Sequence, residues 1–164
     1  MTNVVTVGVY GFTLETFLEA LAGAHVRLVV DVRDRRGVRG TDYAWANAAR
    51  LQAALADAGI EYEHRRDLAT PRALREIQYA ADAEQSVGQR SRTELASEVR
   101  DRYLAEVLAD VALTGLVASF PSEGATALLC VEREPSACHR SLIAERLAAD
   151  LGASVTHLRP REGA

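Results

Sequence analysis

The residues with the clearest chemical potential lie in one short stretch, residues 130–140. Cys130 ends an apolar run, and a thiol, an imidazole and a guanidinium follow together at Cys138, His139 and Arg140. A thiol beside an imidazole can serve as a nucleophile or as a proton donor. A guanidinium is a planar, permanently charged fork suited to phosphate or carboxylate. The stretch therefore predicts a site for an anionic group with a reactive cysteine beside it.

The pattern around these residues predicts a strand, a loop and a helix. The apolar run at 127–131 is typical of a buried strand, and 136–151 has the apolar periodicity of a helix that ends at Gly152. The first turn of this helix would carry Cys138, His139 and Arg140. A helix N-terminus has unpaired N–H groups and the positive end of the macrodipole, so it favours an anion and lowers the pKa of a cysteine.

The rest of the chain alternates between strand and helix patterns. Strands are predicted at 4–9, 26–32, 60–64, 127–131 and 154–158. Helices are predicted at 13–21, 46–58, 103–117 and 136–151. Thr13 is the expected N-cap of the first helix. Residues 70–103 are polar and mostly helical in pattern, with a break at 86–91, and we expect them to pass over the site.

Alternating strands and helices predict a single α/β domain over residues 1–164. The sheet would be mainly parallel with helices on both faces, in three layers, with a core at 4–158 and a tail at 159–164. Ligands of open parallel sheets bind at the carboxyl ends of the strands. The unusual polar groups of this chain leave the predicted strands at those ends, so we expect them to form one site.

The candidate site residues fall into a catalytic group and a ligand-binding group. Asp31 or Glu132 would be the general base, and Cys138 or His139 the nucleophile or proton donor. The expected ligand-binding residues are Gly8, Tyr10, Arg33, His64 and Arg140.

Each candidate also has a purely structural interpretation. Cys130 and Cys138 can be buried apolar residues, and His139 can help to cap its helix. Asp31 can cap a turn, and Arg140 can pair with a nearby glutamate. His64 can be an ordinary core or surface residue. Arg35, Arg36 and Arg39 can belong to a solvated loop or to a loop that steers an anion.

Metal binding is a weaker hypothesis from the spacing. Cys130, Cys138 and His139 are soft ligands, and Asp31 or His64 would complete a set of four. The pattern Cys-x7-Cys-His is not a recognised zinc spacing, so we expect no metal and no cofactor.

The composition excludes several classes of function. Of the 164 residues, 48% are hydrophobic and 26% charged, as in a globular protein. The net charge of −4 argues against a basic coat on nucleic acid. We find neither an apolar run long enough for a membrane span nor a secretory signal, so we expect a cytoplasmic protein with no membrane partner and unpaired cysteines. The apolar helix faces are compatible with a homodimer.

Several segments also resemble one family. The strongest matches are 128–132 (Leu-Leu-Cys-Val-Glu), 138–144 (Cys-His-Arg-Ser-Leu-Ile-Ala) and 30–33 (Val-Asp-Val-Arg). Further matches lie at 6–8, 13–17 and 55–64. In order and spacing the chain is similar to the domain of unknown function 488 family of small bacterial and archaeal proteins. The resemblance implies an α/β fold whose shared residues fall on the sheet edge described above, and it implies no established activity.

Three hypotheses about function follow. The first is an enzyme that acts on a small anionic, phosphate-bearing substrate, such as a nucleotide or a nucleic-acid fragment. The second is a non-catalytic module that senses a nucleotide or docks to a nucleic-acid-processing partner. The third is a metal or thiol-redox protein that uses Cys130 and Cys138.

Overall fold

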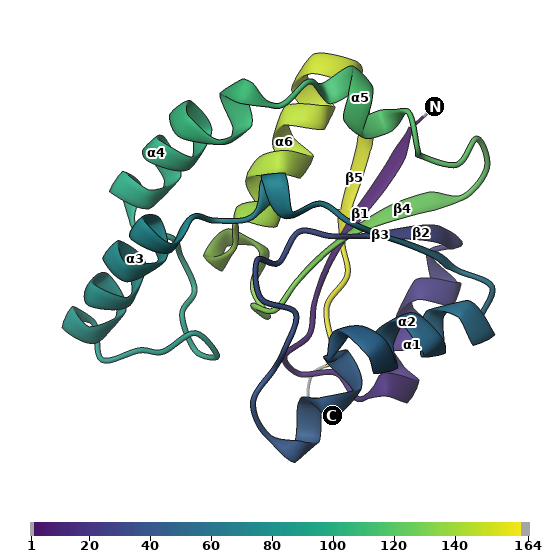
Figure 1. The fold of residues 1–164 in the computed structure, drawn as a ribbon, viewed down its shortest axis with the longest axis horizontal. Coiled ribbons are helices and arrows are strands. Elements are labelled where there is room, and N and C mark those ends of the chain that lie inside the picture. Colours follow the sequence, from purple (N-terminus) through teal and green to yellow (C-terminus); the bar gives the residue numbers. More distant parts are fainter. Residues whose placement is uncertain (1, 162–164) are drawn as a thin grey trace.

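The computed structural model describes residues 2–161 and contains one five-stranded sheet in which every neighbouring pair is parallel (Figure 1). The strand order is β3-β2-β4-β1-β5. The strands are β1 (Asn3–Gly8), β2 (Val26–Asp31), β3 (Glu61–His64), β4 (Ala125–Cys130) and β5 (Ser154–His157). The central strands β1, β2 and β4 are almost continuously buried, as expected of a parallel sheet covered on both faces.

Helices cover both faces of this sheet. They are α1 (Leu14–Gly23), α2 (Ala48–Asp57), α3 (Arg72–Glu84), α4 (Ser97–Glu106), α5 (Leu113–Val117) and α6 (His139–Leu151). In Figure 1, α1 and α2 lie on one side of the strands, and α4, α5 and α6 lie on the other. The α/β class with a parallel sheet and helices on both faces is therefore confirmed.

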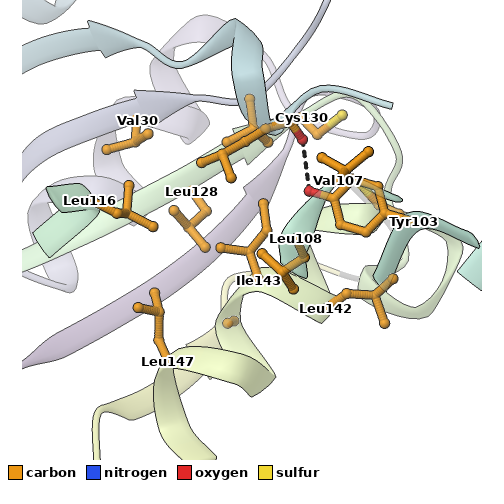
Figure 2. Close-up of a cluster of buried hydrophobic side chains, with 14 of the residues drawn as sticks. Val30, Tyr103, Val107, Leu108, Leu116, Leu128, Cys130, Leu142, Ile143 and Leu147 are labelled. Carbon is orange, nitrogen blue, oxygen red and sulfur yellow. Dashed lines mark hydrogen bonds between the residues drawn. The ribbon is translucent and has the colours of Figure 1, made fainter. Parts of the chain in front are cut away.

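Two apolar clusters hold the layers together. One joins Phe17 and Leu21 of α1 and Leu51 and Leu55 of α2 to the strands. The other, shown in Figure 2, packs α6 and the α4–α5 region against β2 and β4. In that cluster the Tyr103 hydroxyl donates a 2.7 Å hydrogen bond to the Leu68 carbonyl, which satisfies its one buried polar group.

Local sequence signals explain most element boundaries. Thr13 caps α1, as predicted, and forms a capping box with Thr16. Gly152 ends α6 with a φ of 68°, the left-handed conformation that glycine adopts without strain.

Two predicted boundaries were wrong. The last helix begins at His139 and not at 136, because Pro135–Ala137 forms a separate 3₁₀ turn. Cys138 is consequently the N-cap and lies just before the first helical turn. The helix predicted at 103–117 is instead the end of α4, a 3₁₀ turn at Leu108–Asp110 and the short helix α5. Of the predicted tail, residues 162–164 lie outside the described part of the chain. Among residues 2–161, no helix combines the length and apolar character that a bilayer span requires.

Candidate functional site

A pocket of about 730 Å³ opens at the carboxyl ends of the central strands. Five of the predicted site residues form part of its wall, namely Tyr10, Arg33, Glu132, Cys138 and His139. Cys130, a candidate metal ligand, and its neighbour Val131 also line it. The segment between α3 and α4 contributes Gly88, Gln89, Arg90, Arg92 and Leu95. Part of the region 70–103, which was expected to pass over the site, therefore lines this pocket.

Cys138 and His139 form a hydrogen-bonded pair in this wall. The Cys138 Sγ lies 3.7 Å from His139 Nδ1, and His139 Nε2 lies 3.0 Å from the Val32 carbonyl oxygen. A carbonyl can only accept, so Nε2 carries the proton that it donates. Nδ1 is therefore the ring nitrogen that exchanges a proton with the thiol. A thiol, a base and a third group that orients the base are the arrangement of an activated nucleophile.

The surroundings favour the thiolate of Cys138. Burial alone would raise the pKa of Cys138, but the hydrogen bond from Cys130 and the charges of His139 and Arg140 outweigh it and hold that pKa well below its usual value. The hydrogen bond with Cys138 and burial raise the pKa of Cys130. Burial lowers the pKa of His139, whereas the neighbouring Cys138 thiolate raises it, and the resulting shift is upward. Both shifts favour the thiolate of Cys138 and the protonated form of His139.

This assignment makes a prediction for the reduced, metal-free protein. Because the pKa of Cys138 is lowered, its thiolate should form at lower pH than that of an ordinary cysteine, and the ultraviolet absorbance of the thiolate should rise there. Cys138→Ser should remove that step. Cys130→Ala, which deletes the S–H donor, should move the step to higher pH, and Cys130→Ser, which retains a hydroxyl donor, should move it less. A single titration near the ordinary thiol value of about 8.5 in the wild-type protein would contradict the assignment.

Glu132 is held beside the pair by residues that sequence reasoning missed. Its Oε1 accepts from Arg92 at 3.2 Å and from Gln89 at 3.3 Å, and Arg92 also pairs with the buried Asp82. Its Oε2 is buried without a hydrogen-bond partner. Burial and the nearby Cys138 thiolate raise the pKa of Glu132 against the opposing charges of Arg92 and His139. A carboxyl with one free oxygen at this position can exchange a proton with a bound ligand.

Asp31 and His64 do not line the pocket. Asp31 is fully buried, and both of its oxygens accept hydrogen bonds from Arg33, with a further bond from the Tyr62 hydroxyl at 2.6 Å. His64 Nε2 lies 2.7 Å from the Arg33 carbonyl oxygen. The structure therefore gives these two residues the task of fixing the loop after β2, in place of the base and ligand-binding roles expected from the sequence.

Arg33 lines the pocket, but its guanidinium is already occupied. Nε and one amino group bind Asp31, and the other amino group donates to the Ala46 carbonyl at 2.9 Å. Arg33 therefore anchors the pocket wall and has little donor capacity left for an anion.

Arg140 and Gly8 do not have the ligand-binding roles expected from the sequence. Arg140 is fully buried, and its two amino groups donate to the carbonyls of Glu132 and Arg133 at 2.7 and 3.3 Å. It clamps the loop after β4 and does not reach the pocket. Gly8 lies beneath the same loop, where an added Cβ would be 2.8 Å from the Glu132 carbonyl carbon. The predicted ligand-binding residues Gly8 and Arg140 are thus parts of the support of the site.

Exposed arginines surround the mouth of the pocket. Arg35, Arg39 and Arg90 are exposed pocket residues, and none of the ion pairs formed within residues 2–161 includes them. The Arg90 guanidinium lies 5.0 Å from the ring centre of Tyr10 and 5.2 Å from that of Tyr43. Arg90 was not singled out from the sequence, since only its place in the polar 86–91 break pointed toward the site.

These features define a parallel α/β protein with a paired thiol and imidazole under an arginine-rimmed pocket at the sheet edge. The chain belongs to the family described as Domain of unknown function DUF488, whose model matches residues 13–147. No curated protein matches the chain.

Proposed function

We propose that this protein is an enzyme that binds a small anionic substrate of phosphate or nucleotide type in the arginine-rimmed pocket. The observation that carries the proposal is the coincidence of two features in one cavity. Arg35, Arg39 and Arg90 place unpaired positive charge at its mouth, and the Cys138–His139 pair lies in its wall.

The charges of the pocket favour an anion. Its lining includes six arginines against two carboxylates, Asp34 and Glu132. Asp34 is itself paired with Arg66 and Arg75, and Glu132 with Arg92. A guanidinium can bind an anion through two parallel charged hydrogen bonds, so several arginines without an acidic partner at one opening support an anionic ligand.

The Cys138–His139 pair supplies a chemical step for a substrate held there. The imidazole takes up the thiol proton, and the thiolate is the nucleophile. Glu132 has a free carboxyl oxygen in the same pocket and would transfer a proton to or from the substrate.

The proposal can be tested by thermal stabilisation of the metal-free protein with phosphate, nucleotides, sugar phosphates and short oligonucleotides. A ligand at one hundred times its dissociation constant stabilises a protein by about 2.7 kcal/mol. We expect such a ligand to bind about tenfold more weakly to Arg35→Ala/Arg39→Ala, since each of the two lost exposed charge pairs contributes up to about 1 kcal/mol and about 1.4 kcal/mol is tenfold in affinity.

Arg50→Ala/Arg100→Ala is the matched control. These two arginines are also exposed, are absent from the ion pairs within residues 2–161, and lie outside the pocket. The control changes the net charge by the same amount, so it removes any general electrostatic effect. An absence of anionic ligands, or equal weakening by both double variants, would overturn the anion site.

The alternative is a non-catalytic module that senses a nucleotide or docks to a partner with the same arginines. Product analysis with the ligand identified above separates the two hypotheses. An enzyme should convert the ligand, and Cys138→Ser should still bind it but convert it far more slowly. A ligand that the wild-type protein binds and leaves unchanged would favour the module.

A further inference from the structure

Three soft metal ligands converge in the wall of the same pocket. The ligand atoms of Cys130, Cys138 and His139 all lie within 4.8 Å of one another, although two of these residues are separated by eight positions in the chain. Both cysteines are free thiols, and all three side chains are buried. Thiolate sulfur and imidazole nitrogen are the ligands that zinc prefers in proteins.

The separation between Cys138 and His139 fits two ligands of one tetrahedral ion. Zinc–sulfur bonds of about 2.3 Å and zinc–nitrogen bonds of about 2.0–2.1 Å place two tetrahedral ligands about 3.6 Å apart. The Cys138 Sγ lies 3.7 Å from His139 Nδ1. A shift of a few tenths of an ångström would therefore complete the coordination geometry of this pair.

The histidine is already oriented as a metal ligand. Its Nε2–H donates to the Val32 carbonyl at 3.0 Å, so the lone pair of the neutral ring is on Nδ1, which faces the Cys138 sulfur. Histidines that bind metals almost always donate the other ring N–H to a carbonyl or a carboxylate in this way. This contact is an observation independent of the clustering of the thiols.

We propose that Cys130, Cys138 and His139 form a zinc site with one open coordination position. All three ligands line the arginine-rimmed pocket, so the fourth position is left to water or to an oxygen of the bound anion. Three protein ligands with an open fourth position are the pattern of catalytic zinc. The inference rests on the proposed function for the anion that occupies the fourth position. It assigns Cys138 and His139 to the metal, so a metal-bound group replaces the free thiolate nucleophile of that proposal.

Spectroscopic titration tests this site without any activity assay. The protein is stripped with a chelator under reducing conditions and titrated with Co²⁺, then with Zn²⁺. We expect one equivalent of Co²⁺ to bind with thiolate-to-cobalt charge-transfer bands and the visible bands of tetrahedral cobalt, and one equivalent of Zn²⁺ to displace it. A folded wild-type protein that gives no such bands would overturn the proposal.

Matched histidine variants locate the site. His139→Asn should weaken cobalt binding at least about tenfold. Mutation of a residue that only supports a metal ligand already lowers metal affinity by about 10–100-fold, and His139 is a ligand itself. His25→Asn should leave the spectrum unchanged, since His25 is exposed and lies outside the cluster. Equal binding by both variants would contradict the assignment.

Thiol counting on the wild-type protein covers the case in which His139→Asn fails to fold. Zn²⁺ should protect both cysteines from a thiol reagent, and a chelator should remove the protection. Cysteines that react equally with and without Zn²⁺ would overturn the site. Because anion binding is measured on the metal-free protein, failure of the zinc site and failure of the anion site give different results.

Discussion

Gly8→Ala is expected to destabilise the protein by at least about 3 kcal/mol, at the upper end of what overpacking costs. Gly8 ends β1 directly beneath the loop that follows β4. An alanine Cβ would overlap the carbonyl oxygen of Glu132 and would lie 2.8 Å from its carbonyl carbon. These are backbone atoms, so no side-chain rotation relieves the overlap, and the loop must move away from the strand.

The movement would also disturb the site. The Glu132 carbonyl accepts the 2.7 Å hydrogen bond from Arg140, and the same loop leads to Cys138. We therefore expect both a lower free energy of unfolding in urea and a shift of the Cys138 thiolate titration to higher pH.

Gly115→Ala provides the control for the Gly8 variant. Gly115 lies in α5, and no atom lies within 4 Å of an added Cβ. Alanine is a better helix former than glycine by about 1 kcal/mol, so this variant should be neutral or slightly more stable. Equal stability of the two variants would show that the loop does not require the close approach at Gly8.

Arg140→Met is expected to cost about 3 kcal/mol or more. The guanidinium is fully buried and holds two backbone carbonyls of the loop after β4. Hydrogen bonds to charged groups contribute about 1.5–3 kcal/mol each, and methionine would leave both carbonyls without this donor. Arg140→Lys should recover only part of the loss, because a single ammonium does not reproduce the planar fork. Urea unfolding measures both effects.

Arg146→Met is the control within the same helix. Arg146 forms an exposed pair with Asp150, and exposed pairs contribute about 0–1 kcal/mol. A comparable loss of stability for both variants would contradict the role of Arg140 in holding the loop after β4.

The buried position of Arg140 also affects the choice of variants for binding studies. Arg140→Ala would alter ligand binding indirectly, because it destabilises the loop after β4. Arg35 and Arg39 are therefore the better probes of the anion site.

The order of the strands, and the sheet edge at which the candidate residues meet, could be predicted from the sequence. Apolar runs and helical periodicity are local signals, and they gave the five strands in the right order. Because parallel strands present their carboxyl ends at one edge, the polar residues after those strands had to lie close together. That argument correctly gathered Tyr10, Glu132, Cys138 and His139 around one pocket.

The role of each polar side chain at that edge depended on contacts between distant parts of the chain. Asp31 meets Tyr62 across 31 positions, and Glu132 meets Arg92 across 40. Such contacts decide whether a charged group faces the pocket or is paired with a buried partner. No local sequence pattern encodes them.

The sequence by itself determined a parallel α/β fold and the edge of the sheet at which its unusual polar residues gather, because both follow from short-range patterning and from the rules of strand connection. Only the tertiary structure decided that Arg140 supports a loop, that His139 points Nδ1 at a thiol, and that Arg90 joins the pocket rim. The physical reason is that hydrogen bonds select partners by distance and angle in three dimensions. Those distances are fixed by the packing of α6 against the sheet and of α4 against α3 and α6.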